Sequence, residues 1–216
     1  PVVDTDIGKL GTMTCHDGCT PEVSRALGYN GVEVICHPVA LQEAEGVSDP
    51  WDFWRFTRKA RAHDNMCYVL GSNWGSVDYD YYPSAFCPGN SFIIDYTGMM
   101  VREAPYPSEQ VIGATIDIEA LRWHRSRANH NCWIDIRAEA FRQIYDKPIY
   151  PPNQFPAGCP PRTLADKLGP AKEVLDQLYS RGQFMPPAGK TPEEMSSVLE
   201  ERIKYAQDTG RLKKND

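Results

Sequence analysis

A short apolar strand that runs directly into a tight polar turn and then into a helix start is the feature that most restricts the fold. The apolar run ends at Met13, and Cys15 opens the polar turn Cys15-His16-Asp17-Gly18. The stretch Thr20-Pro21-Glu22 combines a hydroxyl N-cap, a proline at the first helical position and an acid in the first turn, which together indicate a helix start. The sequence therefore predicts a strand, a turn that carries Cys15, and a helix.

This placement of Cys15 has two interpretations. A helix N-terminus stabilises a thiolate, and the backbone N-H groups of the same turn can bind a developing oxyanion, so Cys15 is a candidate nucleophile. The alternative is a small buried residue at a strand end, which describes most single cysteines.

The first 118 residues alternate strand-like and helix-like segments. Short strands at residues 2–3 and 7–14 flank a glycine bend, and amphipathic helices are expected at Pro21 to Tyr29 and Pro50 to Asp64. Further strands are expected at residues 67–73, 91–96, 101–103 and 111–116, with a hairpin turn at Asp95-Tyr96-Thr97-Gly98. Such alternation is typical of the α/β class.

The C-terminal third has a different pattern. Residues 119–146 are mostly helical with a polar interruption at residues 129–131, and six prolines between positions 148 and 161 stop regular structure. Two last helices are expected at Thr163 to Arg181, with Gly169-Pro170 as a potential break, and at Thr191 to Thr209. We interpret the proline-rich stretch as an extended arm or linker.

Several segments that follow Cys15 carry a resemblance to a known family. They are Gly28-Tyr29-Asn30-Gly31-Val32-Glu33-Val34-Ile35, Arg58 with Arg61-Ala62, Tyr68-Val69-Leu70-Gly71-Ser72-Asn73, residues 89–98, and Ala114-Thr115-Ile116-Asp117-Ile118. Together with Cys15-His16-Asp17-Gly18 and Pro21-Glu22, they resemble the nitrilase superfamily of carbon-nitrogen hydrolases over residues 1–127, most closely its formamidase and aliphatic amidase branch.

The resemblance implies a fold and a domain organisation. Residues 1–127 are expected to form the C-terminal half of a four-layer α-β-β-α sandwich of the nitrilase type. Residues 128–216 are expected to form an extension with the arm at 148–161 and two helices, at a subunit interface of a homo-oligomer. The alternative is an arm that folds back on its own domain.

The resemblance also implies a chemistry. Cys15 is the expected nucleophile on a small aliphatic amide similar to formamide, and the backbone N-H of His16 is the expected oxyanion donor. The products would be a carboxylic acid and ammonia, formed through a thioester without a metal or an organic cofactor. A nitrilase or an N-carbamoyl hydrolase of the same superfamily is the alternative within this class.

The Glu and Lys of the superfamily's triad lie well upstream of the nucleophile, whereas only fourteen residues precede Cys15. They are therefore not assigned here. We expect the sequence to begin partway through a longer protein. The alternative is a truncated, non-catalytic scaffold subunit.

Other polar residues near Cys15 have competing interpretations. His37 and Pro38, at the end of the next strand, are candidates for lining the substrate pocket. A zinc site built from Cys15, His16, Cys19, Cys36 and His37 is the competing hypothesis, which their irregular spacing disfavours.

Three roles close to Cys15 also remain open. His16 is a weak candidate for a general base, because adjacent residues on a turn point apart. Asp17 and Glu22 are interpreted as a turn cap and a helix first-turn acid, against a role as site acids. Cys19 is interpreted as a packed or resolving thiol.

Composition excludes several other classes of function. The net charge is -6 and the Lys and Arg residues are scattered, which disfavours nucleic-acid binding. No apolar run is long enough to span a bilayer, so we expect no membrane partner and a cytoplasmic location. The seven cysteines are irregularly spaced, which favours reduced thiols over a disulfide framework. The aromatic stretch 74–86 fits a pocket wall and an interface loop equally well.

Overall fold

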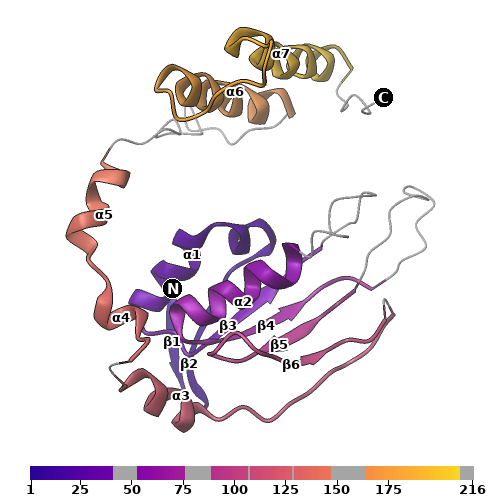
Figure 1. Ribbon diagram of the computed structural model, residues 1–216. Helices are drawn as coiled ribbons and strands as arrows, with labels where there is room; N and C mark the ends of the chain where they lie inside the picture. The colour runs from indigo at the N-terminus through magenta and orange to yellow at the C-terminus, as the bar shows by residue number, and fades with distance from the viewer. Residues whose placement is uncertain (41–52, 76–88, 107, 128, 147–163, 210–216) are drawn as a thin grey trace. The chain divides into compact units, whose positions relative to one another are not determined.

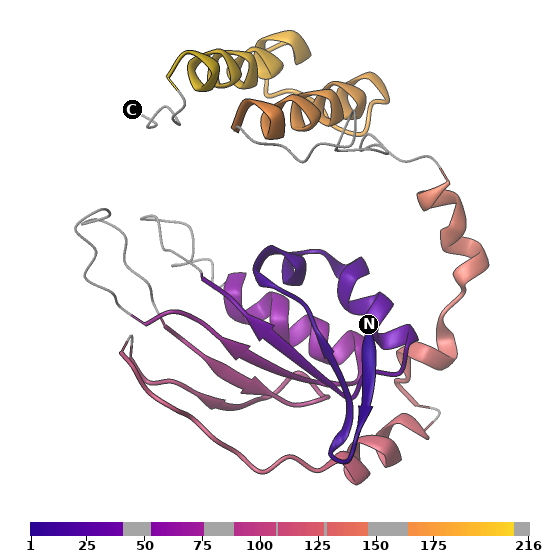
Figure 2. The same cartoon turned by 180° about the vertical axis from the view of Figure 1, so that it is seen from behind.

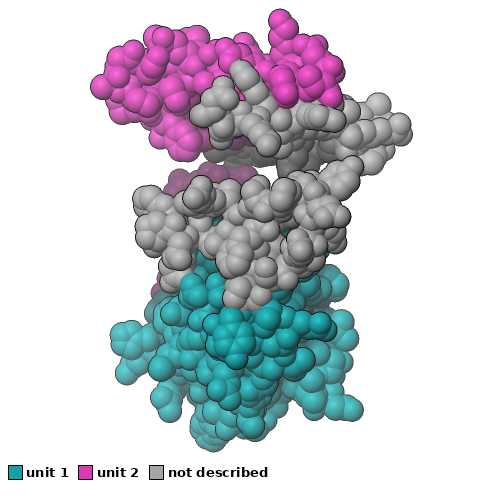
Figure 3. Space-filling view, turned by 90° about the vertical axis from the view of Figure 1, so that its right-hand side faces the viewer, with its two compact units in different colours: residues 1–136 teal, residues 137–216 magenta. Residues whose placement is uncertain are grey.

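A computed structural model shows a mixed α/β unit followed by a helical unit (Figure 1). It describes residues 1–40, 53–75, 89–106, 108–127, 129–146 and 164–209. The chain divides into two compact units, Pro1–Ile136 and Arg137–Asp216, which Figure 3 colours separately. The predicted α/β class is confirmed.

Unit 1 is built on a six-stranded sheet with the order β1-β2-β3-β4-β5-β6. Antiparallel pairing joins β1 to β2, β4 to β5 and β5 to β6, whereas β2, β3 and β4 are parallel. The strands are β1 Val2–Thr5, β2 Gly8–Thr12, β3 Val34–Pro38, β4 Tyr68–Ser72, β5 Phe92–Ile94 and β6 Met100–Glu103. Parallel neighbours need crossover connections, and two helices supply them.

The crossovers are α1 Pro21–Tyr29, between β2 and β3, and α2 Phe53–Asn65, between β3 and β4. Both helices cover the same face of the sheet (Figures 1 and 2). The main core forms between them and the strands, where the following side chains are buried: Met13, Leu27, Val32, Ile35, Val39, Trp54, Ala62, Cys67, Val69, Phe92 and Ile94. This packing fixes the start of α1 over the end of β2.

The opposite face of the sheet is covered in part by α3 Ile118–Arg125. Leu121 of that helix packs with Val34 and Tyr68 in a second, smaller core. Asp117 caps the helix by accepting a hydrogen bond from Ala120 N at 2.8 Å. Farther along this face, Cys36 of β3 is exposed.

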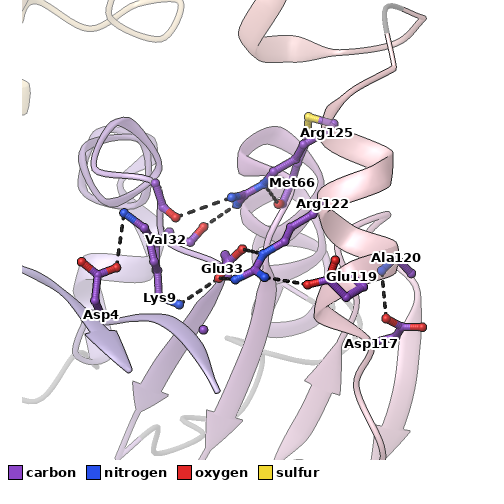
Figure 4. Close-up of polar contacts among 12 residues, drawn as sticks. Asp4, Lys9, Val32, Glu33, Met66, Asp117, Glu119, Ala120, Arg122 and Arg125 are labelled. Carbon is purple, nitrogen blue, oxygen red and sulfur yellow. Dashed lines mark hydrogen bonds and ion pairs between the residues drawn. The ribbon is translucent and has the colours of Figure 1, made fainter. Parts of the chain in front are cut away.

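A buried carboxylate ties α3 to the sheet (Figure 4). Glu33 accepts hydrogen bonds from Arg122 Nε at 2.7 Å and from the backbone N of Lys9 at 2.9 Å. Arg125 donates to the carbonyl oxygens of Met66, at 2.9 Å, and of Val32. The Arg122 guanidinium holds the pKa of Glu33 below its ordinary value.

The strand predicted at residues 111–116 is wrong. The structure assigns no strand between β6 and α3, and the side chain of Val111 is 99% exposed. Val111 is therefore not buried against the sheet, whereas Ile116 packs on the second core of Val34, Tyr68 and Leu121 without strand pairing. The segment is anchored instead by Tyr68, whose hydroxyl accepts from Asp117 N at 3.1 Å.

The other expected elements of unit 1 are close to those observed. The helix expected at Pro21 to Tyr29 has those bounds, and the expected hairpin turn closes with Gly98 N donating to Asp95 O at 2.9 Å. The second helix starts at Phe53 in the described part of the chain, and positions 50–52 of its expected range lie outside the described residues. Residues 119–146 contain α3, α4 Cys132–Asp135 and the start of unit 2.

Unit 2 contains three helices among its described residues: α5 Ala138–Tyr145, α6 Leu164–Ser180 and α7 Pro192–Thr209. Helix α6 continues through Pro170. Thr191 N and Glu194 N each bond to the other residue's side chain, at 2.8 and 3.2 Å, which is the predicted capping arrangement at the start of α7. The arm at 148–161 lies outside the described residues. Within the described parts of both units, no helix is both long and apolar enough to cross a membrane.

We predict that Glu33→Gln lowers the free energy of unfolding by about 1–3 kcal/mol, because it weakens a buried charge-assisted contact. The matched control is Glu119→Gln, which removes the exposed partner of the same Arg122 and should change stability by less than about 0.5 kcal/mol. Urea unfolding measures both. An equal loss in the two variants would contradict the prediction.

The difference in stability between wild type and Glu33→Gln depends on pH, and the direction in which the pKa of Glu33 is shifted gives the sign of that dependence. Because the folded-state pKa of Glu33 lies below its ordinary value of 4.5, the stabilisation is complete above the unfolded-state pKa. It is lost as pH falls through the lower folded-state pKa. The gap between wild type and Glu33→Gln should therefore be constant at neutral pH and should close in acid.

Candidate active site

Cys15 lies where the sequence predicts it, between the end of β2 and the start of α1. Residues Cys15–Cys19 form a short 3-10 helix, η1, and α1 begins two residues later. The strand side is fixed by Met13 N, which donates to Cys36 O of β3 at 3.2 Å. The side chain of Cys15 is partly exposed, and its thiol is free.

The backbone at Cys15 is in the left-handed region, with φ +48°. A residue with a Cβ atom in that conformation costs about 1–2 kcal/mol relative to the right-handed form. Such strain persists only where neighbouring contacts impose it. Part of the restraint comes from Asp17, whose Oδ2 accepts from Thr14 N at 2.8 Å and whose N donates to Thr14 O at 2.9 Å. These contacts favour the interpretation of Asp17 as a turn cap.

The other restraint is on the carbonyl oxygen of Cys15. Nε2 of His37 lies 2.9 Å from it, and Nη2 of Arg58 donates to it at 3.2 Å. Both side chains are buried, each with 1% exposure. Two elements, β3 and α2, therefore converge on one backbone oxygen of the turn.

The proton on His37 can be placed from its neighbours. Arg58 Nε lies 3.4 Å from Nδ1, and because a guanidinium only donates, Nδ1 must accept. The proton is then on Nε2, which donates to Cys15 O. Burial lowers the pKa of His37 to about 4, so the ring is neutral at physiological pH.

Arg58 and Arg61 lie one turn apart on the inner face of α2. Arg58 Nη1 donates to Thr57 Oγ1 at 2.6 Å, and the guanidinium stacks over the Trp54 ring, 4.3 Å from its centroid. Arg61 donates to the carbonyl oxygens of Gly18 and Cys19, at 3.4 and 3.3 Å. The two arginines thus bond to three carbonyls of the turn.

Sequence reasoning assigned these arginines no functional role. In an amphipathic helix, charged residues are normally solvated. The signal that distinguishes Arg58 and Arg61 is their position on the same helical face as Trp54 and Ala62, which are buried. Buried charges at such positions need polar partners, and here the turn supplies them.

The remaining predicted site residues are spread over the turn and β3. The His16 side chain is exposed, and the Cys19 thiol lies 3.8 Å from Arg58 Nη1. Cys36 is exposed. The described residues contain no group of three His, Cys, Asp or Glu side chains placed to hold a metal ion, so the five side chains of the zinc hypothesis do not form such a group.

His37 and Pro38 both border a hollow of about 550 Å³ on the sheet. Thr12, Cys36, Leu70, Ser72 and Phe92 are among the other residues around it. Pro38 is exposed there, whereas the imidazole of His37 is buried and bonded to the turn. Of the aromatic stretch 74–86, residues 76–86 lie outside the described residues.

Comparisons with known proteins give consistent matches to this part of the chain. The sequence model of the carbon-nitrogen hydrolase family matches residues 1–125. A citrullinase of Francisella tularensis is 30% identical over 148 residues, which are 68% of this chain and 51% of that protein. An N-carbamoylputrescine amidase of Arabidopsis thaliana is 30% identical over 131 residues, 57% of this chain and 44% of that protein. The chain thus spans about half the length of these relatives.

Solved structures share the fold. A carbon-nitrogen hydrolase from Helicobacter pylori superposes with a TM-score of 0.59 at 24% identity, covering 67% of this chain and 51% of that one. A variant amidase from Nesterenkonia sp. superposes with a TM-score of 0.52 at 20% identity, covering 66% and 46%. That structure shows covalent addition of the acetamide moiety of fluoroacetamide at the active site cysteine of the amidase.

The left-handed backbone at Cys15 leads to a stability prediction. Cys15→Gly should be more stable than Cys15→Ala by about 1 kcal/mol, because glycine adopts φ +48° without the Cβ penalty. The control pair is Cys19→Gly and Cys19→Ala, where φ is not positive and alanine should be the more stable. Urea unfolding of the four variants measures both differences. The same order at both positions would show that the backbone of Cys15 is unstrained.

Proposed function

The chain belongs to the carbon-nitrogen hydrolase family, and from this premise we propose that Cys15 is the nucleophile of an enzyme that hydrolyses a C-N bond. The observation that carries the proposal is a free, partly exposed thiol on a left-handed turn whose carbonyl is held by two buried side chains. A packed structural cysteine does not require such a turn. Several independent contacts keep the backbone of Cys15 in this strained conformation.

The proposed reaction has two stages. The Cys15 thiolate attacks the amide carbon and forms a C-S bond, while the carbonyl electrons move to oxygen and the backbone N-H of His16 binds that oxyanion. The C-N bond then breaks, and the nitrogen takes a proton and leaves as ammonia. Water attacks the thioester, the C-S bond breaks, and the carboxylic acid and the thiol are released. The base and the oxyanion lysine that the superfamily uses are not assigned to residues of this sequence.

The substrate we propose is a small aliphatic amide similar to formamide. A carbamoyl compound is the second candidate, because two relatives at 30% identity are named citrullinase and N-carbamoylputrescine amidase. In either case Pro38 and the hollow of about 550 Å³ are proposed to border the substrate. His37 is proposed to border the substrate through its backbone, because both of its ring nitrogens face the turn and Arg58.

We also propose a homo-oligomer assembled through the C-terminal extension. Phe141 and Ile144 of α5 are 50% and 62% exposed. Because they lie three residues apart on one helix, these side chains form a contiguous exposed apolar patch, which is typical of a surface that a partner covers. Sedimentation of the native protein should show an oligomer that Phe141→Asp weakens. A monomer in both cases would contradict this proposal.

The activity is tested by ammonia release from formamide, acetamide, simple nitriles and carbamoyl compounds. Cys15→Ala and Cys15→Ser should each lower turnover by more than about a thousandfold, because both remove the nucleophile. Cys132→Ser is the matched control, since that thiol lies on α4, and it should keep its activity. Turnover that survives in the Cys15 variants would rule this residue out as the nucleophile. No turnover of any compound by wild type would favour the scaffold alternative.

A further inference from the structure

The carbonyl of Cys15 and the N-H of His16 belong to one peptide unit. A peptide unit is planar, and in the trans form its C=O and N-H point in opposite directions. A contact that fixes the Cys15 oxygen on one side therefore fixes the direction of the His16 N-H on the other side. The N-H in question is the one proposed to bind the oxyanion.

Two donors fix that oxygen from different elements. His37 Nε2, on β3, lies at 2.9 Å and Arg58 Nη2, on α2, lies at 3.2 Å. Arg58 also contacts the ring of His37, because its Nε lies 3.4 Å from Nδ1. The three groups form a closed set in which neither side chain can turn without losing a contact. The peptide unit is thus held at its oxygen by a rigid pair.

The free-energy cost of burying the Arg58 guanidinium indicates that its hydrogen bond to Cys15 O has a specific role. Its guanidinium is 1% exposed, and no carboxylate pairs with it among the residues the structure describes. A buried cation without a counter-charge is expensive and is normally kept for a specific polar contact. Among the described residues, the partners of Arg58 are Cys15 O, Thr57 Oγ1, the His37 ring, the Cys19 thiol and the faces of Trp54 and Phe53. Three of these six contacts are to the turn itself or to His37, which bonds to the same carbonyl.

Gly18 provides the space for this arrangement. A Cβ atom at position 18 would lie 2.7 Å from Cε1 of His37 and 3.0 Å from Cζ of Arg58. A side chain there would push both groups away from Cys15 O. The glycine of Cys15-His16-Asp17-Gly18 is therefore required by the close approach of the two donors to the turn.

We propose that Arg58 and His37 are positioning residues, which hold the Cys15 carbonyl so that the His16 N-H points at the oxyanion. The proposal rests on the proposed function and adds to it how the oxyanion donor is aimed. Hydrogen bonds to the carbonyl also polarise the peptide unit and strengthen its N-H as a donor.

Arg58→Lys is the direct test, because lysine keeps the charge but cannot reach both Cys15 O and the His37 ring in the fork geometry of a guanidinium. We expect kcat for the best amide substrate to fall about tenfold or more while KM stays within about twofold, since the oxyanion contact forms only in the transition state. Arg61→Lys is the matched control. Arg61 is 8% exposed on the same helix and bonds to Gly18 O and Cys19 O, but not to Cys15 O. Its kcat should stay within about threefold of wild type.

Iodoacetamide labelling of the same proteins distinguishes a loss of oxyanion binding from a loss of the fold or of the reactive Cys15 thiol. Displacement of iodide by a thiolate builds no oxyanion, so the labelling rate of Cys15 should stay within about threefold in Arg58→Lys. Peptide mass spectrometry reads Cys15 together with two internal references, the exposed Cys36 and the fully buried Cys67. Labelling of Cys67 would report loss of the fold.

A fall in kcat for Arg58→Lys alone, with Cys15 labelled normally and Cys67 protected, supports the proposal. Unchanged kcat, an equal fall in Arg61→Lys, or a loss of Cys15 labelling as large as that of kcat would overturn it. If Arg58→Lys exposes Cys67, Gly18→Ala decides by the same criteria, because it displaces the same two donors. Absence of turnover in wild type removes the function itself, and the proposal with it.

Discussion

The hydrogen bonds that His37 and Arg58 make to the carbonyl oxygen of Cys15 are the interaction on which the candidate site depends. They join the end of β3 and the middle of α2 to a turn that would otherwise be free to relax from its left-handed backbone. The parallel pairing of β2, β3 and β4 makes this possible, since it brings the ends of β2 and β3 to the same edge of the sheet. The crossover helix α2 then passes over that edge with Arg58 facing inward.

The buried charged side chains of unit 1 are stabilised in the same way. At the other end of the sheet, Glu33 and Arg122 fix α3, and Arg125 bonds to carbonyls of neighbouring loops. In each case a charged side chain leaves water only where backbone groups and a counter-charge or an aromatic face replace its solvation. The Glu33 contacts fix a helix and serve stability. The Arg58 contacts fix a single peptide unit, which is why we assign them to the chemistry.

The sequence could predict the elements whose signals are local. The helix from Pro21 to Tyr29 has its proline, its first-turn acid and its apolar face in nine consecutive residues, and its predicted bounds are those observed. The strand at 111–116 was not, because β-branched residues favour a strand only when a sheet edge is available to pair with, and Val111 is 99% exposed. The burial of Arg58 depends on tertiary packing against η1, which lies 39 to 43 residues away in the sequence and leaves no local pattern. Cys15 and His37 could be singled out from the sequence, whereas the contacts of His37 and Arg58 with the Cys15 carbonyl could not.

The central claim is that the thiol of Cys15 is the group that attacks substrate. The most direct measurement incubates the native protein with fluoroacetamide, digests it, and locates the adduct by peptide mass spectrometry. We predict one acetamide adduct per chain, on Cys15, formed faster than any adduct on the more exposed Cys36. Modification of Cys36 ahead of Cys15, or a fully active protein with Cys15 modified, would contradict it.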